Sequence, residues 1–113
     1  MFQEMLQLSS GGGGGDELTQ IWSNTYRSGY TSSININIEK NARFISFSSS
    51  DPTATVFNVF IDFDGKTYAT TSNNSTEILI YIPKNSTSKT FKLWNNASKG
   101  NACTVTVKQY TLD

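Results

Sequence analysis

The stretch TVFNVFIDFDGKTYATT, at residues 55–71, decides the fold. In its first half every second side chain is apolar, namely Phe57, Val59, Ile61 and Phe63. Such alternation is typical of a β-strand with one buried face. Asp64 and Gly65 come next and favour a two-residue turn of type I′, because both central residues of that turn take a positive φ. The stretch therefore predicts a β-hairpin with three facing pairs, which are Phe63 and Lys66, Asp62 and Thr67, and Ile61 and Tyr68.

The same alternation recurs in short runs along the rest of the chain. One further run is expected at residues 21–27, and the others are marked by Ile34, Ile36 and Ile38; Ile45 and Phe47; Ile78, Ile80 and Ile82; Phe91 and Leu93; and Cys103, Val105 and Val107. Pro83 ends the run that spans residues 76–82, because proline has no amide proton for a sheet. No stretch of ten or more residues has helical periodicity. The sequence therefore predicts one all-β domain at residues 16–113, an antiparallel β-sandwich of about eight strands, a number that suits a jelly roll.

The composition excludes several classes of function. The 113 residues include nine Lys and Arg, nine Asp and Glu, one Cys and no His. Zero net charge argues against a nucleic-acid-binding protein, since phosphate contacts need an excess of basic side chains. Without His, the chain has no Ser-His-Asp or Cys-His catalytic set, and one Cys forms neither an internal disulfide nor a thiolate zinc site. We therefore expect a protein that is not an enzyme, has no cofactor and does not bind nucleic acid.

The N-terminal segment differs from the rest of the chain. Residues 1–8 are MFQEMLQL, and three apolar residues, Phe2, Met5 and Leu6, have the spacing of one helical face. A run of glycines follows, consisting of Gly11, Gly12, Gly13, Gly14 and Gly15. This pattern indicates an apolar anchor on a flexible hinge at residues 1–15, and the alternative is a frayed terminus.

Neither an export signal nor a membrane span is expected. The start of the chain lacks the positive charge of a signal peptide, and Glu4 interrupts its apolar run. No stretch approaches the roughly 18 consecutive apolar residues that a membrane-spanning helix needs. The sequence therefore predicts no signal peptide and no membrane insertion.

Two carboxylates and one thiol are the candidates for a chemical site. Asp62 and Asp64 are two residues apart, so both could face the same side of a strand and bind calcium, or act as the acid and base of a glycosidase. The turn already explains Asp64, and no further acidic residues flank the pair. Cys103 alternates with Val105 and Val107, which favours a buried apolar role. We therefore predict no catalytic residue and no metal site.

Aromatic residues are the main candidates for a binding surface. The strongest are Trp22, Tyr26, Tyr81 and Trp94, and Tyr30 and Tyr110 are further members. Tyr81 and Trp94 lie on the strand faces opposite the apolar ones, and Trp94 is followed by two Asn residues. Three interpretations remain open: core packing in a sheet covered on both faces, a subunit interface, or a sugar-binding surface.

The overall plan resembles small structural proteins of bacteriophage virions, such as head-fibre proteins, decoration proteins and tail-tip adhesins. The resemblance comes from the apolar start MFQEMLQL, the Ser and Gly tether at residues 9–15, and the β-domain rich in Ser, Thr and Asn, and it covers the whole chain. It implies an all-β and often trimeric protein that docks onto other virion proteins through its N-terminus and faces the host with its β-domain, where it could contact host-surface glycans.

The resemblance also implies where the chain works and which residues attach it. Phe2, Met5 and Leu6 would dock onto the particle, and Gly11–Gly15 would be the hinge. Assembly in the host cytoplasm requires neither a signal peptide nor disulfides. The rival interpretation is a monomeric carbohydrate-binding β-sandwich, whose sugar platform would include Trp22, Tyr26 or Trp94.

Overall fold

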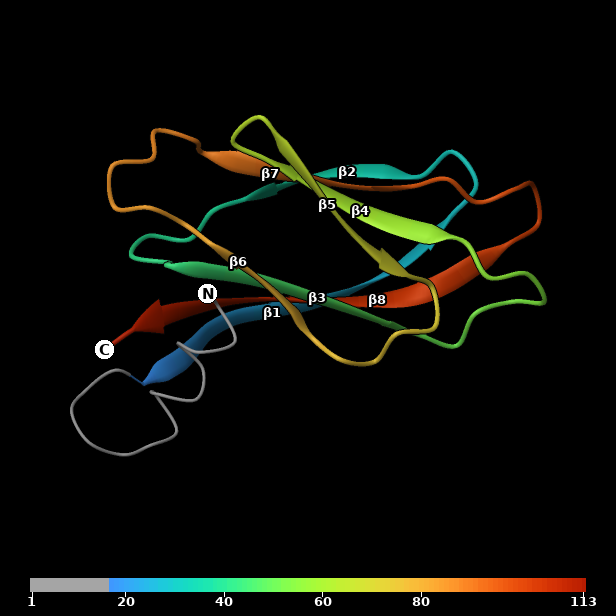
Figure 1. The fold of residues 1–113 in the computed structure, drawn as a ribbon, viewed down its shortest axis with the longest axis horizontal. Helices are drawn as coiled ribbons and strands as arrows, with labels where there is room; N and C mark the ends of the chain where they lie inside the picture. Colours follow the sequence, from blue (N-terminus) through green and yellow to red (C-terminus); the bar gives the residue numbers. More distant parts are fainter. Residues whose placement is uncertain (1–16) are drawn as a thin grey trace.

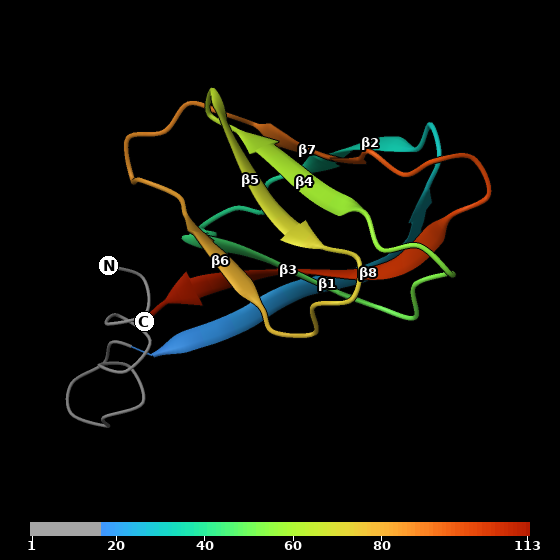
Figure 2. The same ribbon diagram turned by 45° about the vertical axis from the view of Figure 1, so that its right-hand side comes forward.

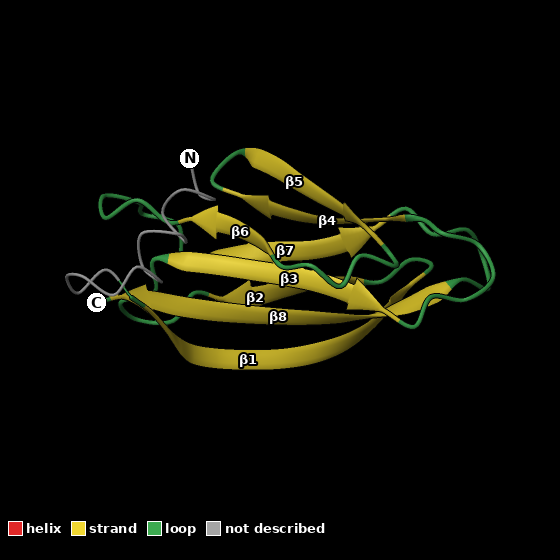
Figure 3. Ribbon diagram, turned by 60° about the horizontal axis from the view of Figure 1, so that its bottom comes forward, coloured by secondary structure: helices red, strands yellow, loops and turns green. Residues whose placement is uncertain are grey.

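The computed structural model describes residues 17–113, which form two four-stranded antiparallel sheets (Figure 1). Sheet A has the strand order β1-β8-β3-β6, and sheet B has the order β2-β7-β4-β5. The strands are β1 (Leu18–Gly29), β2 (Ser33–Asn37), β3 (Phe44–Ser50), β4 (Asn58–Phe63), β5 (Lys66–Thr71), β6 (Ile78–Tyr81), β7 (Thr90–Asn95) and β8 (Ala102–Leu112). Sheet B lies above sheet A in Figures 1 and 2, and Figure 3 shows only strands and loops in this part of the chain. The predicted all-β sandwich is confirmed.

The strand pairing is that of a jelly roll. The chain pairs β1 with β8, β2 with β7, β3 with β6 and β4 with β5, all antiparallel. It is therefore one long hairpin whose tip is the turn between β4 and β5. The hairpin is rolled up, because β3 also pairs with β8 and β4 also pairs with β7. This arrangement gives the eight-stranded double sheet predicted from the strand count.

The turn at Asp64 and Gly65 has the predicted geometry. Their φ values are 53° and 79°, so both central residues have the positive φ of a type I′ turn. All three facing pairs have the predicted register, including Ile61 with Tyr68. The strand before the turn is shorter than predicted and begins at Asn58. Its expected start at Thr55 is wrong, because the amide of Thr55 donates to the Asn101 side chain in the loop between β7 and β8.

The inward-facing side chains of both sheets make one apolar core. All four apolar residues of the quoted strand are buried, and Val59 and Ile61 are fully so. Cys103 is also fully buried, as predicted, and this burial raises the pKa of its thiol. Removal of such side chains from water is the main driving force for folding. The core therefore explains why the apolar alternation decides the fold.

The two ends of the sandwich differ. β1 starts and β8 ends side by side, because the amide of Asp113 donates to the Glu17 carbonyl at 2.9 Å (Figure 1). The opposite end carries the connection between β1 and β2 and the one between β7 and β8. Asn95, the last residue of β7, joins the ends of β7 and β1 here, since its Nδ2 donates to Ser28 Oγ at 2.9 Å and to the Gly29 carbonyl at 2.8 Å. A side-chain amide therefore holds the two strand ends together at this end.

The predicted anchor (Phe2, Met5 and Leu6) and hinge (Gly11–Gly15) lie outside the described residues. Residues 17–113 contain no helix that is long and apolar enough to cross a membrane.

Candidate functional site

The four aromatic residues chosen from the sequence lie in three separate places. Trp22 and Tyr26 are on the inner face of β1 and pack against the core. Tyr81 is on the outer face of sheet A, where it is in register with Phe44. Trp94 is on the outer face of sheet B. The structure therefore does not bring the four residues together into one site.

Trp22 and Tyr26 share one face, as their spacing indicated, but that face is the inner one. Their partners on β8 are Gln109 and Val105, which are both fully buried. A β-bulge between Gln20 and Trp22 shifts the register of β1, so that Trp22 and Tyr26 face inward and Ile21 is 39% exposed. Both rings are half-buried, so for these two residues the structure agrees with core packing.

Trp94 is part of an aromatic pair on the outer face of sheet B. Phe60 on β4 is its register partner, and the two rings stack with their centroids 4.2 Å apart and their planes 24° apart. Both side chains are half-buried. Sequence analysis did not single out Phe60, although it is the one aromatic residue on the polar face of its strand, beside Asn58 and Asp62. This exception to the alternation of apolar and polar residues is the sequence signal that could have identified Phe60 as a surface aromatic residue.

An ion pair lies in the next row of the same face. Lys92 Nζ is 3.7 Å from Asp62 Oδ2, and the Thr67 hydroxyl donates to Asp62 Oδ1 at 2.7 Å. The Lys92 ammonium is also 5.8 Å from the centroid of the Trp94 ring, within cation–π range. Phe60, Asp62, Lys92 and Trp94 are together called the sheet B patch below.

The electrostatics of Asp62 reflect these neighbours. Desolvation alone would raise the pKa of Asp62, but the Trp94 indole, the Thr67 hydroxyl and the Lys92 ammonium together hold it below its ordinary value. Within the described chain, Trp94 Nε1 is buried and makes no hydrogen bond of normal geometry. It lies close enough to the carboxylate to favour its charged form. Asp62 is therefore an ionised partner of Lys92 at neutral pH.

The sheet B patch suits contact with protein better than contact with sugar. Stacking on a sugar needs an open aromatic face, whereas the Trp94 ring already has Phe60 stacked on it and the Lys92 ammonium nearby. Interface centres are enriched in aromatic residues, and Trp is among the residue types enriched in the few positions that carry most of the binding energy. The patch has this composition, with an ion pair beside the rings.

Sheet A carries a second set of outward-facing aromatic residues. Phe44 lies in register between Tyr81 on β6 and Tyr110 on β8, and these three residues are called the sheet A row. The rings of Phe44 and Tyr81 are 5.5 Å apart and tilted by 56°. Phe44 is 1% exposed although it faces away from the core between the sheets. Aromatic surface therefore lies on the outer faces of both sheets.

A carboxylate also organises the sheet A row. Glu77 Oε2 accepts hydrogen bonds of 2.6 Å from the Tyr110 hydroxyl and from the Ser46 hydroxyl. Burial and the adjacent carboxylate together raise the pKa of Tyr110 well above its ordinary value of 10. This phenol therefore stays protonated and donates to Glu77 at neutral pH.

Asp62 and Asp64, the candidate calcium or glycosidase pair, have separate partners. Asp62 is bound to Lys92 and Thr67, whereas Asp64 Oδ1 accepts a hydrogen bond from Ser88 Oγ at 3.1 Å. In residues 17–113 no three His, Cys, Asp or Glu side chains lie close enough together to hold a metal ion.

No protein-family model matches this chain, and no curated protein is recognisably related to it in sequence. Inferences about its function therefore start from the jelly roll and from the surfaces described above.

Proposed function

We propose that this chain is a non-enzymatic structural protein of a bacteriophage virion. Its jelly roll packs against neighbouring copies through the sheet B patch, in a homotrimer. The observation that supports this proposal most directly is the stacked pair of Phe60 and Trp94 on an outward sheet face, at 4.2 Å. Exposed aromatic clusters of this kind mark protein contact surfaces more often than plain solvent-facing sheet.

The fold supports the proposal by analogy. Eight-stranded jelly rolls form the shells of many virus particles, and they also occur in lectins. Fold alone does not assign function, so this support is weaker than that of the patch. The analogy nevertheless agrees with the plan of the chain, in which an apolar segment at residues 1–8 and a glycine run precede the domain.

Attachment is assigned to the N-terminal segment. Residues 1–15 would bind other virion proteins, with Phe2, Met5 and Leu6 as the contact side chains. The described chain begins at Glu17, beside the C-terminal Asp113, so the attachment segment joins the sandwich at one end.

The first experiment is light scattering on the full chain and on a shortened chain that begins at Asp16. We expect the mass of three subunits in both, because the proposed contacts lie in the β-domain. Ala69→Arg should reduce the mass to one subunit, because Ala69 is exposed and is the register partner of Phe60 on β5. Thr25→Arg is the matched control, since Thr25 is exposed on the outer face of sheet A.

Two results would contradict the subunit contact: a one-subunit mass of the unaltered chain at every concentration, or an unchanged mass for Ala69→Arg. The attachment role is tested separately by sedimentation with phage particles. The full chain should co-sediment and the chain that begins at Asp16 should not. Equal co-sedimentation of both would exclude attachment through residues 1–15.

The second candidate function is a monomeric carbohydrate-binding module. The occurrence of jelly rolls in lectins favours it, and so does a pocket at the edge of the sandwich, where Tyr81 lies. It predicts a one-subunit mass together with sugar binding, so the same light-scattering experiment separates it from the structural proposal.

A further inference from the structure

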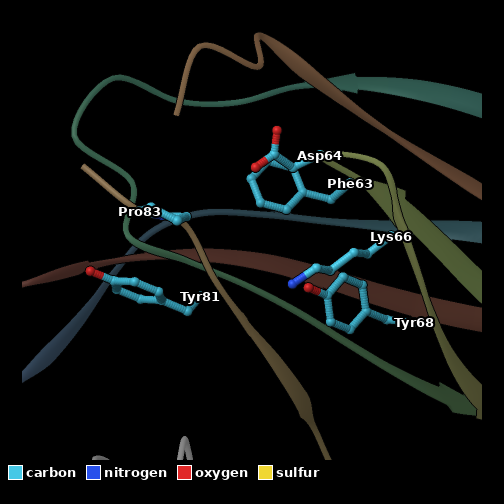
Figure 4. A pocket seen from close by; sticks show the side chains of 6 residues that line it. All are labelled: Phe63, Asp64, Lys66, Tyr68, Tyr81 and Pro83. Carbon is cyan, nitrogen blue, oxygen red and sulfur yellow. The ribbon is translucent and has the colours of Figure 1, made fainter. Parts of the chain in front are cut away.

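The edge of the sandwich formed by β5 and β6 contains a pocket of about 230 Å³ (Figure 4). Its lining residues are Phe63, Asp64, Lys66, Tyr68, Tyr81 and Pro83. β5 is the last strand of sheet B and β6 is the last strand of sheet A, so neither has a further strand beside it. The pocket thus lies at the open edge of the sandwich, with lining residues from both edge strands, and it is separate from the sheet B patch.

The hairpin turn places two opposite charges at the rim of the pocket. Asp64 takes a φ of 53° in the turn, and Lys66 is the first residue of β5. The Ser88 hydroxyl, from the connection between β6 and β7, donates to Asp64 Oδ1 and so orients the carboxylate. Within residues 17–113, Asp64 Oδ2 accepts no hydrogen bond and Lys66 makes no ion pair. Both groups therefore have hydrogen-bonding capacity left for a ligand.

The rest of the wall is mostly aromatic. Tyr68 and Tyr81 come from the two edge strands and Phe63 from the end of β4, and Pro83 completes the apolar part. In Figure 4 the Lys66 ammonium lies beside the Tyr68 hydroxyl, and Tyr81 lies across from them, below Pro83 in this view. An apolar wall with a few polar groups at the rim is the usual form of a small-molecule site.

Charge and size together indicate the class of ligand. An anion would meet the Asp64 carboxylate and a cation would meet the Lys66 ammonium, so a neutral ligand is favoured. The ligand should have hydroxyl groups that donate to Asp64 and accept from Lys66, and an apolar face that rests on tyrosine. A volume of 230 Å³ is below the roughly 300–1,000 Å³ typical of sites for drug-sized ligands, which leaves room for one ring.

We propose that the edge pocket binds one neutral hexopyranose ring of a glycan. Vicinal hydroxyls of the ring donate to the Asp64 carboxylate, the Lys66 ammonium donates to a ring hydroxyl oxygen, and a C–H face of the sugar packs on Tyr68. This proposal goes beyond the proposed function, because it adds a ligand of a named class, and it places the sugar site away from Trp94. The edge pocket and the sheet B patch can then be occupied at the same time.

The test is ligand-observed NMR saturation transfer with the methyl glycosides of glucose, galactose and mannose, and with methyl glucuronide as a charged probe. We expect the full chain to bind at least one neutral glycoside and to bind the glucuronide more weakly. Asp64→Asn keeps a side chain that tolerates the positive φ, and Lys66→Met keeps the apolar stem. Each should weaken binding about tenfold or more, because each removes hydrogen bonds to a charged group.

Lys84→Met is the matched control, because Lys84 is exposed and does not line the pocket, and it should bind as the unaltered chain does. The proposal is overturned if no neutral glycoside binds, if Asp64→Asn and Lys66→Met bind unchanged, or if the glucuronide binds best. The mass of both variants should stay that of the unaltered chain, and a change would show that the pocket is a subunit contact instead. Sugar binding by a one-subunit protein would support the pocket and contradict the trimer.

Discussion

The outer faces of the two sheets use similar residues for different purposes. Each has aromatic rings next to one carboxylate, which is Glu77 on sheet A and Asp62 on sheet B. Glu77 accepts hydrogen bonds from neutral hydroxyls, whereas Asp62 is paired with the Lys92 ammonium. The outward ring of Phe44 is 1% exposed, whereas Phe60 and Trp94 are only half-buried. The Phe44 ring is therefore packed fully within the folded domain, whereas Phe60 and Trp94 keep part of their surface exposed.

The pKa directions express the same difference. The pKa of Tyr110 is raised, because burial and the adjacent Glu77 carboxylate both oppose a second negative charge. The pKa of Asp62 is lowered, because its hydrogen bonds and Lys92 outweigh desolvation. Glu77, which makes no ion pair within the described residues, thus helps to keep the Tyr110 phenol protonated. Asp62, which is paired with Lys92, keeps its own negative charge. Three measurements test this difference between the two outer faces, with expected effects that decrease in size from the first to the last.

The largest expected effect is on the free energy of unfolding when one ring is removed from each face. Phe44→Ala should cost about 3–5 kcal/mol, the range for a fully buried Phe. Phe60→Ala should cost about 1–2 kcal/mol, because a half-buried ring loses less area from the folded state. Urea denaturation measures both. Phe44→Leu, which should cost less, keeps the comparison possible if Phe44→Ala fails to fold.

Repeating this first test at several protein concentrations separates a subunit contact from packing within one domain. If the sheet B patch joins subunits, the cost of Phe60→Ala should increase as the protein is concentrated, because association stabilises only the unaltered chain. The cost of Phe44→Ala should not change with concentration. A larger cost for Phe60 than for Phe44 in dilute protein would reverse the assignment of the two faces.

Local patterns in the sequence predicted the strands but not the surfaces. Alternation and the pair Asp64-Gly65 predicted the hairpin and its register, because these are properties of neighbouring residues. The contact of Phe60 with Trp94 depends on β4 pairing with β7, which is a long-range choice. The same holds for the sheet A row, which needs β3 between β6 and β8. Sequence analysis therefore found Trp94 and Tyr81 but missed their partners Phe60 and Phe44.

The edge pocket illustrates the same limit. Asp64, Lys66 and Tyr68 follow from the hairpin and were placed correctly relative to one another. Tyr81 and Pro83 reach the pocket only because β6 is the last strand of the other sheet. No local pattern in the chain specifies which strands lie at the edges, so the pocket could not be predicted from the hairpin alone.

The second test uses alkaline pH and Tyr110. Its folded-state pKa lies above its unfolded value of about 10, so its contribution to stability is complete below pH 10 and is lost as the pH rises above that value. The free energy of unfolding should therefore fall more steeply above about pH 10 in the unaltered chain than in Tyr110→Phe. Urea denaturation across this range measures the slopes. Tyr30→Phe is the control, because Tyr30 is 53% exposed, and parallel profiles for all three proteins would contradict the raised pKa of Tyr110.

The smallest expected effect is the acid response of Asp62. Its folded-state pKa lies below the unfolded value of 3.8, so its contribution to stability is present above pH 3.8 and is lost as the pH falls below it. The change should be under about 1 kcal/mol, because the side chains of Lys92 and Asp62 are 45% and 35% exposed and solvent screens the ion pair. Asp62→Asn should remove this acid-dependent loss, and high salt should reduce it in the unaltered chain.

Assembly into a trimer should increase the cost of protonating Asp62. If a neighbouring subunit covers the sheet B patch, the ion pair of Asp62 and Lys92 loses solvent, and the same protonation then costs more in the trimer than in the separate domain. Lowering the pH below 3.8 should therefore dissociate the trimer before the domain unfolds. Light scattering and circular dichroism on one sample measure the two events. Simultaneous loss of mass and structure would place Asp62 outside the subunit contact.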